Sequence, residues 1–211
     1  NRVTRDHTEI MLEAFGANIH IKNTGDRKKI KIIGKKELHS KNIVVPNDLS
    51  SSAFFIVCAL INKNSNLVLK GINNNPTRNG LVLALKKMGA KMTFYNKRFS
   101  NNEIICDIKV SSSDLKGCEL GPEFADLMID EYPILAIAAS FADSPSLFRG
   151  LKELKVKESD RLKLIVYNLQ NCGVDCKTVN NDLYINPSNN YKIKSKNIKT
   201  DYDHRIAMSF A

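Results

Sequence analysis

Charged side chains gather at two places where the sequence predicts the start of an apolar helix. The first is Lys157-Glu158-Ser159-Asp160-Arg161 and the second is Asp203-His204-Arg205. A helix start carries unpaired backbone N–H groups that favour anions. Lys157 and Arg161 are four residues apart, so on one helix they share a face. Together with Arg205 they predict a site for carboxylate and phosphate oxygens. The simpler interpretation is a pair of solvated, charged helix ends.

Composition limits the classes of partner. The chain has 211 residues, of which 43% are hydrophobic, enough for a sizeable core. Its formal net charge of +10 favours anionic partners such as phosphorylated metabolites, nucleic acid or acidic lipid. The basic residues are dispersed and no helix-turn-helix or aromatic-basic motif accompanies them, so we predict no nucleic-acid partner. The longest apolar run, 53–61, is too short to cross a bilayer, so we predict no membrane segment.

The cysteines indicate a reducing compartment. They are odd in number and irregularly spaced, and no second pair or pair of histidines completes a zinc-binding set. We therefore predict no metal and no cofactor, with reduced, non-catalytic thiols in a cytoplasmic protein. Cys58 and Cys172 fall within apolar patterns, which predicts that both lie in the core.

The elements that must position these charges follow a repeated order of buried helix, strand, amphipathic helix, strand and strand. Amphipathic helices are expected to end at Gly16, Gly89 and Gly173, because a left-handed glycine turns the chain from helix into strand. Helices that are apolar nearly all round, and therefore buried, are expected over 52–61, over 132–141 and from 205 onward. Strands are expected over 18–21, 29–33, 66–70, 91–94, 103–110, 146–149, 175–179 and 182–185. The repeat predicts an α/β (α+β) fold with buried helices inside mixed or antiparallel sheets.

Six stretches in order resemble the 5-enolpyruvylshikimate-3-phosphate synthases, especially the bacterial group insensitive to glyphosate. They are TRDHTE at 4–9, VPNDLSSSAF at 45–54, NPTR at 75–78, MIDEYP at 128–133, KVKESDRL at 155–162 and DHRIAM at 203–208. One hexamer carries little weight, whereas six in the right order along the whole chain are specific to the family.

The resemblance implies a fold and a reaction. The family's fold has two domains of βαβαββ units in an inside-out barrel. Residues 1–45 are then the tail of the N-terminal domain and 46–211 an incomplete C-terminal domain. The implied reaction transfers the enolpyruvyl group of phosphoenolpyruvate to the 5-hydroxyl of shikimate 3-phosphate and releases phosphate, a step of aromatic amino acid biosynthesis. The chain covers about half of the family's length. We therefore expect a truncated barrel that is inactive alone and needs the missing N-terminal half, with a monomer at full length.

The resemblance also implies catalytic roles, each with a structural alternative. Asp130 corresponds to the carboxylate that takes the proton of the attacking hydroxyl, although its place before a buried helix also fits an N-cap. Glu158 corresponds to a second catalytic carboxylate near the reacting carbon, although a helix-start charge pair with Arg161 explains it as well. His204 is implied as a hydrogen-bond donor to the intermediate, or else as a structural histidine.

The implied substrate ligands are four cations. Arg5 and Lys157 correspond to residues that bind shikimate 3-phosphate. Arg161 and Arg205 correspond to the arginines that hold the carboxylate and phosphate of phosphoenolpyruvate, for which bidentate guanidinium contacts are suited. Two alternatives stay open: the sister enzyme that transfers enolpyruvyl to UDP-N-acetylglucosamine, and a folded remnant that keeps the motifs without the chemistry.

Overall fold

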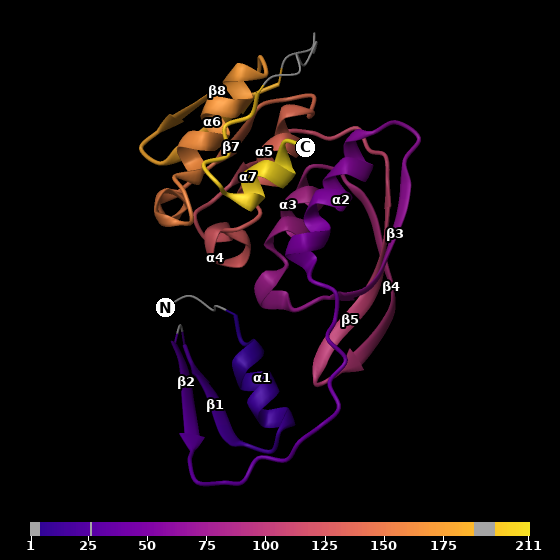
Figure 1. Cartoon of the computed structure of the whole chain (residues 1–211), viewed down its shortest axis with the longest axis vertical. Coiled ribbons are helices and arrows are strands. Elements are labelled where there is room, and N and C mark those ends of the chain that lie inside the picture. Colours follow the sequence, from indigo (N-terminus) through magenta and orange to yellow (C-terminus); the bar gives the residue numbers. More distant parts are fainter. Residues whose placement is uncertain (1–4, 26, 188–196) are drawn as a thin grey trace.

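The computed structural model describes residues 5–25, 27–187 and 197–211. Thr4, the first residue of the TRDHTE stretch, lies outside the described residues. Helix α1 (His7–Ala14) and the antiparallel hairpin of β1 (Asn18–Thr24) and β2 (Arg27–Ile33) form the lower part of the molecule in Figure 1. An irregular segment then leads up to the larger part, which holds every later element.

The larger part contains two successive copies of the expected unit. In the first, the sheet order is β3-β5-β4 and all pairings are antiparallel. Its elements are α2 (Leu49–Ile61), β3 (Asn66–Asn73), the 3-10 turn η1 (Pro76–Arg78), α3 (Gly80–Lys87), β4 (Lys91–Ser100) and β5 (Glu103–Ser111).

The second copy has the sheet order β6-β7-β9-β8, with a parallel β6–β7 pair and antiparallel pairs elsewhere. The short strand β6 and helix α4 were not expected from the sequence. Its elements are β6 (Glu119–Leu120), α4 (Phe124–Met128), α5 (Tyr132–Ser140), β7 (Ser146–Phe148), η2 (Lys152–Val156), α6 (Arg161–Asn171), β8 (Asp175–Val179), β9 (Asp182–Asn186) and α7 (His204–Ser209).

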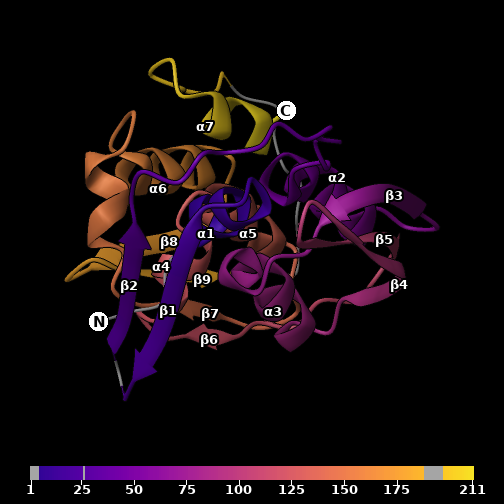
Figure 2. The same ribbon diagram turned by 90° about the horizontal axis from the view of Figure 1, so that it is seen from below.

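Two of the three helices predicted to be buried, α2 and α5, occupy the inside. The prediction is wrong for α7, which buries only Ile206 and Ser209 and leaves Met208 44% exposed. Helix α2 packs against α5, and these helices lie between the β3-β5-β4 sheet and the four-stranded sheet (Figures 1 and 2). Ala53, Ile56 and Leu60 of α2 are fully buried, as are Leu135 and Ala138 of α5. The fold class is therefore confirmed as repeated α/β units with buried helices. The strands of the described residues form three separate open sheets, and none of these closes into a barrel.

Glycine ends the amphipathic helices where the sequence placed it. Gly16, Gly89 and Gly173 have φ values of +90°, +87° and +91°. Each follows the last turn of its helix and precedes a strand. A residue with a side chain is strained in this conformation, so the positions favour glycine.

The prediction for two cysteines is wrong. Cys58 is exposed because it lies on the side of α2 that is not buried, like Phe55, which is 62% exposed. Cys172 is half-buried at the end of α6, whereas Cys106 and Cys176 are the buried thiols. None of the five cysteines forms a disulfide bond. Within the described ranges, no helix combines the length and the apolar character required to cross a bilayer.

Candidate functional site

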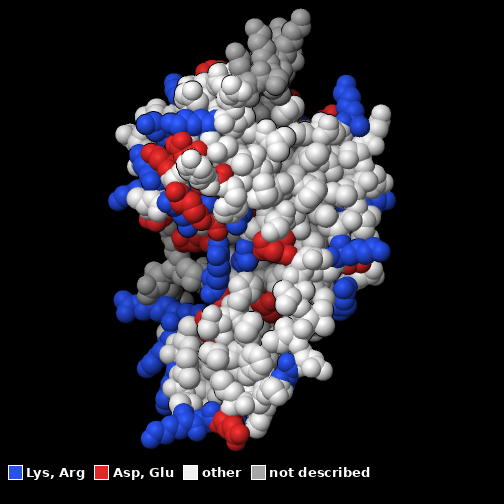
Figure 3. All heavy atoms as spheres, viewed as in Figure 1, with Lys and Arg blue, Asp and Glu red and all other residues white. Residues whose placement is uncertain are grey.

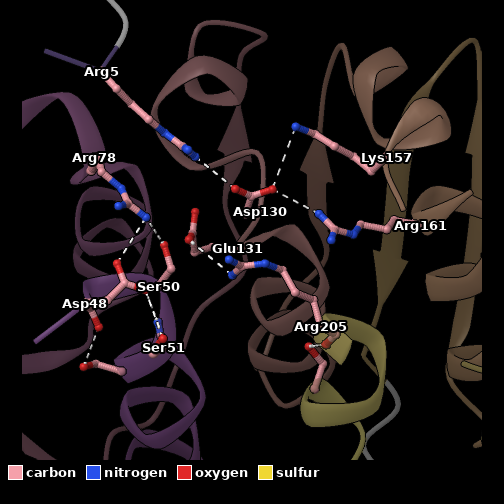
Figure 4. Close-up of polar contacts among 12 residues, drawn as sticks. Arg5, Asp48, Ser50, Ser51, Arg78, Asp130, Glu131, Lys157, Arg161 and Arg205 are labelled. Carbon is pink, nitrogen blue, oxygen red and sulfur yellow. Dashed lines mark hydrogen bonds and ion pairs between the residues drawn. The ribbon is translucent and has the colours of Figure 1, made fainter. Parts of the chain in front are cut away.

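Basic and acidic side chains lie intermixed at the indentation between the lower and upper parts of the molecule (Figure 3). Asp130 lies in the turn that joins α4 to α5. The N-cap residue of α5 is Glu131, whose side chain makes no capping bond, so the N-cap interpretation of Asp130 is wrong. The carboxylate of Asp130 points instead toward cations (Figure 4).

Three cations from separate segments contact Asp130. Arg5 Nη2 lies 2.9 Å from Oδ2, while Arg161 Nη1 and Lys157 Nζ lie 3.0 and 3.9 Å from Oδ1. Burial raises the pKa of Asp130, but Arg5, Arg205 and Lys157 together lower it below the ordinary aspartate value. Asp130 is therefore ionised at neutral pH, and in this arrangement it is a weak base.

Arg161 is fully buried, so the solvated-end interpretation is wrong for this residue. Its guanidinium donates from Nε to Asp203 Oδ2 at 2.8 Å and from Nη1 to Asp130, and Nη2 contacts Glu158. Three carboxylates thus replace the water that a buried charge loses. Helix α6 begins at Arg161 because Asp160 caps it. Lys157 precedes the helix, so the expectation that Lys157 and Arg161 share a helix face is also wrong.

Asp203 joins the two helix starts. It accepts from the backbone N–H groups of Arg205 and Ile206 at 2.9 and 3.4 Å, which caps α7. It also accepts from Ser159 Oγ at 2.9 Å and from Arg161. Burial raises the pKa of Asp203, but Arg161 and Ser159 lower it more, so the net pKa is below the ordinary value. The sequence indicated only an aspartate before a helix, because a buried partner 42 residues away leaves no local signal.

Arg205 reaches the cluster through Glu131, which sequence reasoning missed. Arg205 Nη1 lies 3.8 Å from Glu131 Oε1, and the Glu131 side chain is 6% exposed. Burial raises the pKa of Glu131, more than Ser50, Arg205 and Arg78 lower it. Arg78 also donates to Ser50 Oγ.

The remaining sequence-predicted residues lie at the edge. Glu158 is 55% exposed on its side chain and contacts Arg161. His204 is the exposed first residue of α7, and it makes no hydrogen bond or ion pair to the described residues of the cluster. The structure thus brings Arg5, Lys157, Arg161 and Glu158 together around Asp130. Arg205 contacts Glu131, the residue that follows Asp130. Such an arrangement can bind oxygen anions next to an ionised carboxylate.

Comparison with known proteins identifies relatives over the whole chain. A family model described as EPSP synthase (3-phosphoshikimate 1-carboxyvinyltransferase) matches residues 1–211. A 3-phosphoshikimate 1-carboxyvinyltransferase of Brucella melitensis is 43% identical over 210 residues, which is 99% of this chain and 47% of the relative. The protein of the same name from Pseudomonas sp. is 44% identical with the same shares covered.

A solved structure has the same fold. The EPSP synthase of Acinetobacter baumannii superposes with a TM-score of 0.89 at 40% identity, over 99% of this chain and 47% of that chain. The chain therefore spans about half the length of the curated relatives and of the solved structure that it matches.

Proposed function

The chain belongs to the EPSP synthase family, and we propose that it supplies one side of the site at which that family's reaction takes place. In this reaction the 5-hydroxyl of shikimate 3-phosphate adds to phosphoenolpyruvate. The tetrahedral intermediate then eliminates phosphate and leaves the enolpyruvyl ether. The observation that carries the proposal is the ionised Asp130, held by Arg5 at 2.9 Å and by Arg161 at 3.0 Å, with Arg205 beside it.

Proton transfer is the proposed task of Asp130. As the new C–O bond forms, the hydroxyl must lose its proton, and a positioned carboxylate can accept it. Asp130 is a weak base while Arg5 and Lys157 face it. We propose that both cations contact the phosphate group of shikimate 3-phosphate when it binds. Their release from Asp130 then raises its pKa toward the ordinary value and strengthens it as a base.

The other residues receive roles from the same reasoning. The Arg205 side chain is 17% exposed, and among the described residues its guanidinium contacts one carboxylate, Glu131, at 3.8 Å. It therefore has donors left for the carboxylate or phosphate of phosphoenolpyruvate. Arg161 is engaged by three carboxylates. Its proposed contact with phosphoenolpyruvate requires that one of its N–H donors is released by Asp130 or Glu158. Glu158, whose side chain is 55% exposed, is proposed as the second catalytic carboxylate, and His204 as a donor to the intermediate.

A further polypeptide is proposed to complete the site. The β1–β2 hairpin pairs Ile21 with Ile30 and Ile19 with Ile32 on one face. Ile21, Ile30 and Ile32 are 47%, 42% and 57% exposed, because the eight-residue α1 covers only part of this face. A two-stranded hairpin with an open apolar face is marginally stable in water. We propose that residues 1–45 belong to an N-terminal domain whose remainder covers it, and that 46–211 belong to the C-terminal domain. The assembled protein is proposed to be a cytoplasmic monomer.

The test measures phosphate release from phosphoenolpyruvate and shikimate 3-phosphate. We expect no release with the chain alone. We expect release when the remaining half of the Brucella melitensis relative is added as a separate polypeptide. Asp130→Asn abolishes that release, whereas Glu119→Gln, which removes an exposed carboxylate paired with Arg149, leaves it unchanged. Release with UDP-N-acetylglucosamine but not with shikimate 3-phosphate contradicts the proposed substrate. Equal release by the Asp130→Asn variant contradicts the proposed role.

A further inference from the structure

Glu131 is a buried carboxyl that neither the capping of α5 nor a hydrogen-bonded ion pair explains. The residue is 5% exposed, and its Oε1 atom has no hydrogen-bond partner in the described part of the chain. A buried carboxylate oxygen without a hydrogen bond is costly and is uncommon in folded proteins. Such an atom calls for a functional or structural reason.

Charged groups face Glu131 from several elements. Arg205 comes from α7, Arg78 from η1, and Asp130 is the neighbouring residue on the same turn. Figure 4 shows Glu131 between Arg78 on one side and Arg205 on the other, with Ser50 of α2 nearby. Of these two described cations, Arg78 is already held by Asp48 at 3.2 Å and by Ser50, which leaves Arg205 to pair with Glu131.

The contact between Arg205 and Glu131 is incomplete. Their closest atoms are 3.8 Å apart, beyond the 2.7–3.2 Å of an N–H···O hydrogen bond. Arg205 is also the more exposed partner, at 17% against 6% for the side chains. An anion that approaches from the open side therefore meets the guanidinium of Arg205 before it meets Glu131, and the two negative groups compete for one cation.

We propose that Glu131 holds the guanidinium of Arg205 in the free protein and takes up a proton from the solvent when an anion binds that guanidinium. The inference rests on the proposed function only in that Arg205 binds an anion. A second negative charge beside a buried carboxylate disfavours its ionised form, and protonation removes the competition. Burial already raises the pKa of Glu131, which makes the proton easy to add. Asp130 stays ionised because the buried Arg161, which a ligand anion does not displace, contacts it at 3.0 Å.

Calorimetry of sulfate binding tests this proton uptake. The experiment covers about pH 6 to 8. Sulfate is suitable because its own protonation does not change in this range. Titrations in PIPES and in Tris, which differ in ionisation heat, give the number of protons taken up per sulfate bound. We expect up to about one proton for the wild type at pH 6–8 and none for Glu131→Gln. At pH 8 the Glu131→Gln variant should bind sulfate more tightly, by about tenfold for each pKa unit that the anion adds.

The matched control is Glu119→Gln, which removes an exposed carboxylate that pairs with Arg149. This variant should keep the proton uptake and the sulfate affinity of the wild type. Uptake that persists in Glu131→Gln overturns the inference while the anion site remains. Absence of sulfate and phosphoenolpyruvate binding contradicts the proposed function. For that case, the carboxyl carbon of Glu131 is followed by NMR during a pH titration of the ligand-free wild type. A midpoint at or below 4.5, the ordinary glutamate value, overturns the inference by itself.

Discussion

Replacement of Asp203 by asparagine tests whether one buried carboxylate fixes both helix starts. Asp203 is 1% exposed and its partner Arg161 is 0% exposed. Removal of one member of a buried ion pair costs about 3–5 kcal/mol when the other charge is left alone. Arg161 keeps Asp130 and Glu158, so we expect the lower end, about 3 kcal/mol of unfolding free energy. Asparagine caps helices about as well as aspartate, so the change reports the charge and not the cap.

The assay is urea unfolding followed by far-ultraviolet circular dichroism, with the free energy taken from the midpoint and slope. Asp203→Ala should lose about 1 kcal/mol more than Asp203→Asn, because the cap of α7 goes as well. The matched control is Glu119→Gln. Glu119 and Arg149 are 2.7 Å apart, close to the 2.8 Å between Asp203 and Arg161, but their side chains are 61% and 43% exposed. Solvent weakens an exposed pair, so the control should change stability far less.

Equal losses of stability in Asp203→Asn and Glu119→Gln refute the reasoning. That result means that burial adds nothing to the Asp203–Arg161 interaction. Unchanged stability of Asp203→Asn has the same meaning if the folded variant gives the wild-type circular dichroism spectrum.

Four further outcomes follow from the same structure. The pKa of Asp203 is below its ordinary 3.8, so the folded state binds fewer protons than the unfolded state. Its contribution to stability is therefore present above about pH 4 and lost below, and calorimetric Tm should fall less steeply with acid in Asp203→Asn. Asp48→Ala should cost about 1–2 kcal/mol in urea unfolding, because Asp48 caps α2 through Ser51 N–H at 2.9 Å. Gly173→Ala should cost about 1–2 kcal/mol from strain at φ +91° although no atom obstructs the new Cβ. Cys58 should react first with a thiol reagent, whereas burial raises the pKa of Cys176 to about 12 and protects it until unfolding.

Much of the fold is readable from local patterns because each unit carries its own signals. The period of apolar residues distinguishes amphipathic from all-apolar helices, and the predicted buried helices α2 and α5 are found inside. The helix from 205 onward was misassigned, because α7 buries only Ile206 and Ser209. Glycines at the ends of the amphipathic helices predict the turn into a strand. The two-residue β6 and five-residue α4 were missed because such short elements are held by tertiary contacts and contain too little periodicity.

The candidate site was only partly readable. The sequence indicated which cations stand at helix starts, since that is a local property. It could not indicate that Arg161 points inward to Asp203, because long-range pairing depends on how α6 and α7 pack. Glu131 was missed because it precedes a buried helix and reads as part of the helix start, while its burial is decided by α7 and α2. Cys58 was misassigned because an apolar run does not show which side of α2 faces solvent.

Exposure divides the cations of the site into two sets with different tasks. Arg161 is held in place from all sides by Asp130, Glu158 and Asp203, so it positions Asp130. Arg5 and Lys157 are 48% and 32% exposed and reach Asp130 by single contacts. Exposed single ion pairs are worth little, so a ligand anion can displace them at small cost, whereas displacement of Arg161 breaks a buried network. Affinity for an anionic ligand should therefore depend on Arg5, Lys157 and Arg205. The position of the Asp130 carboxylate should depend on Arg161.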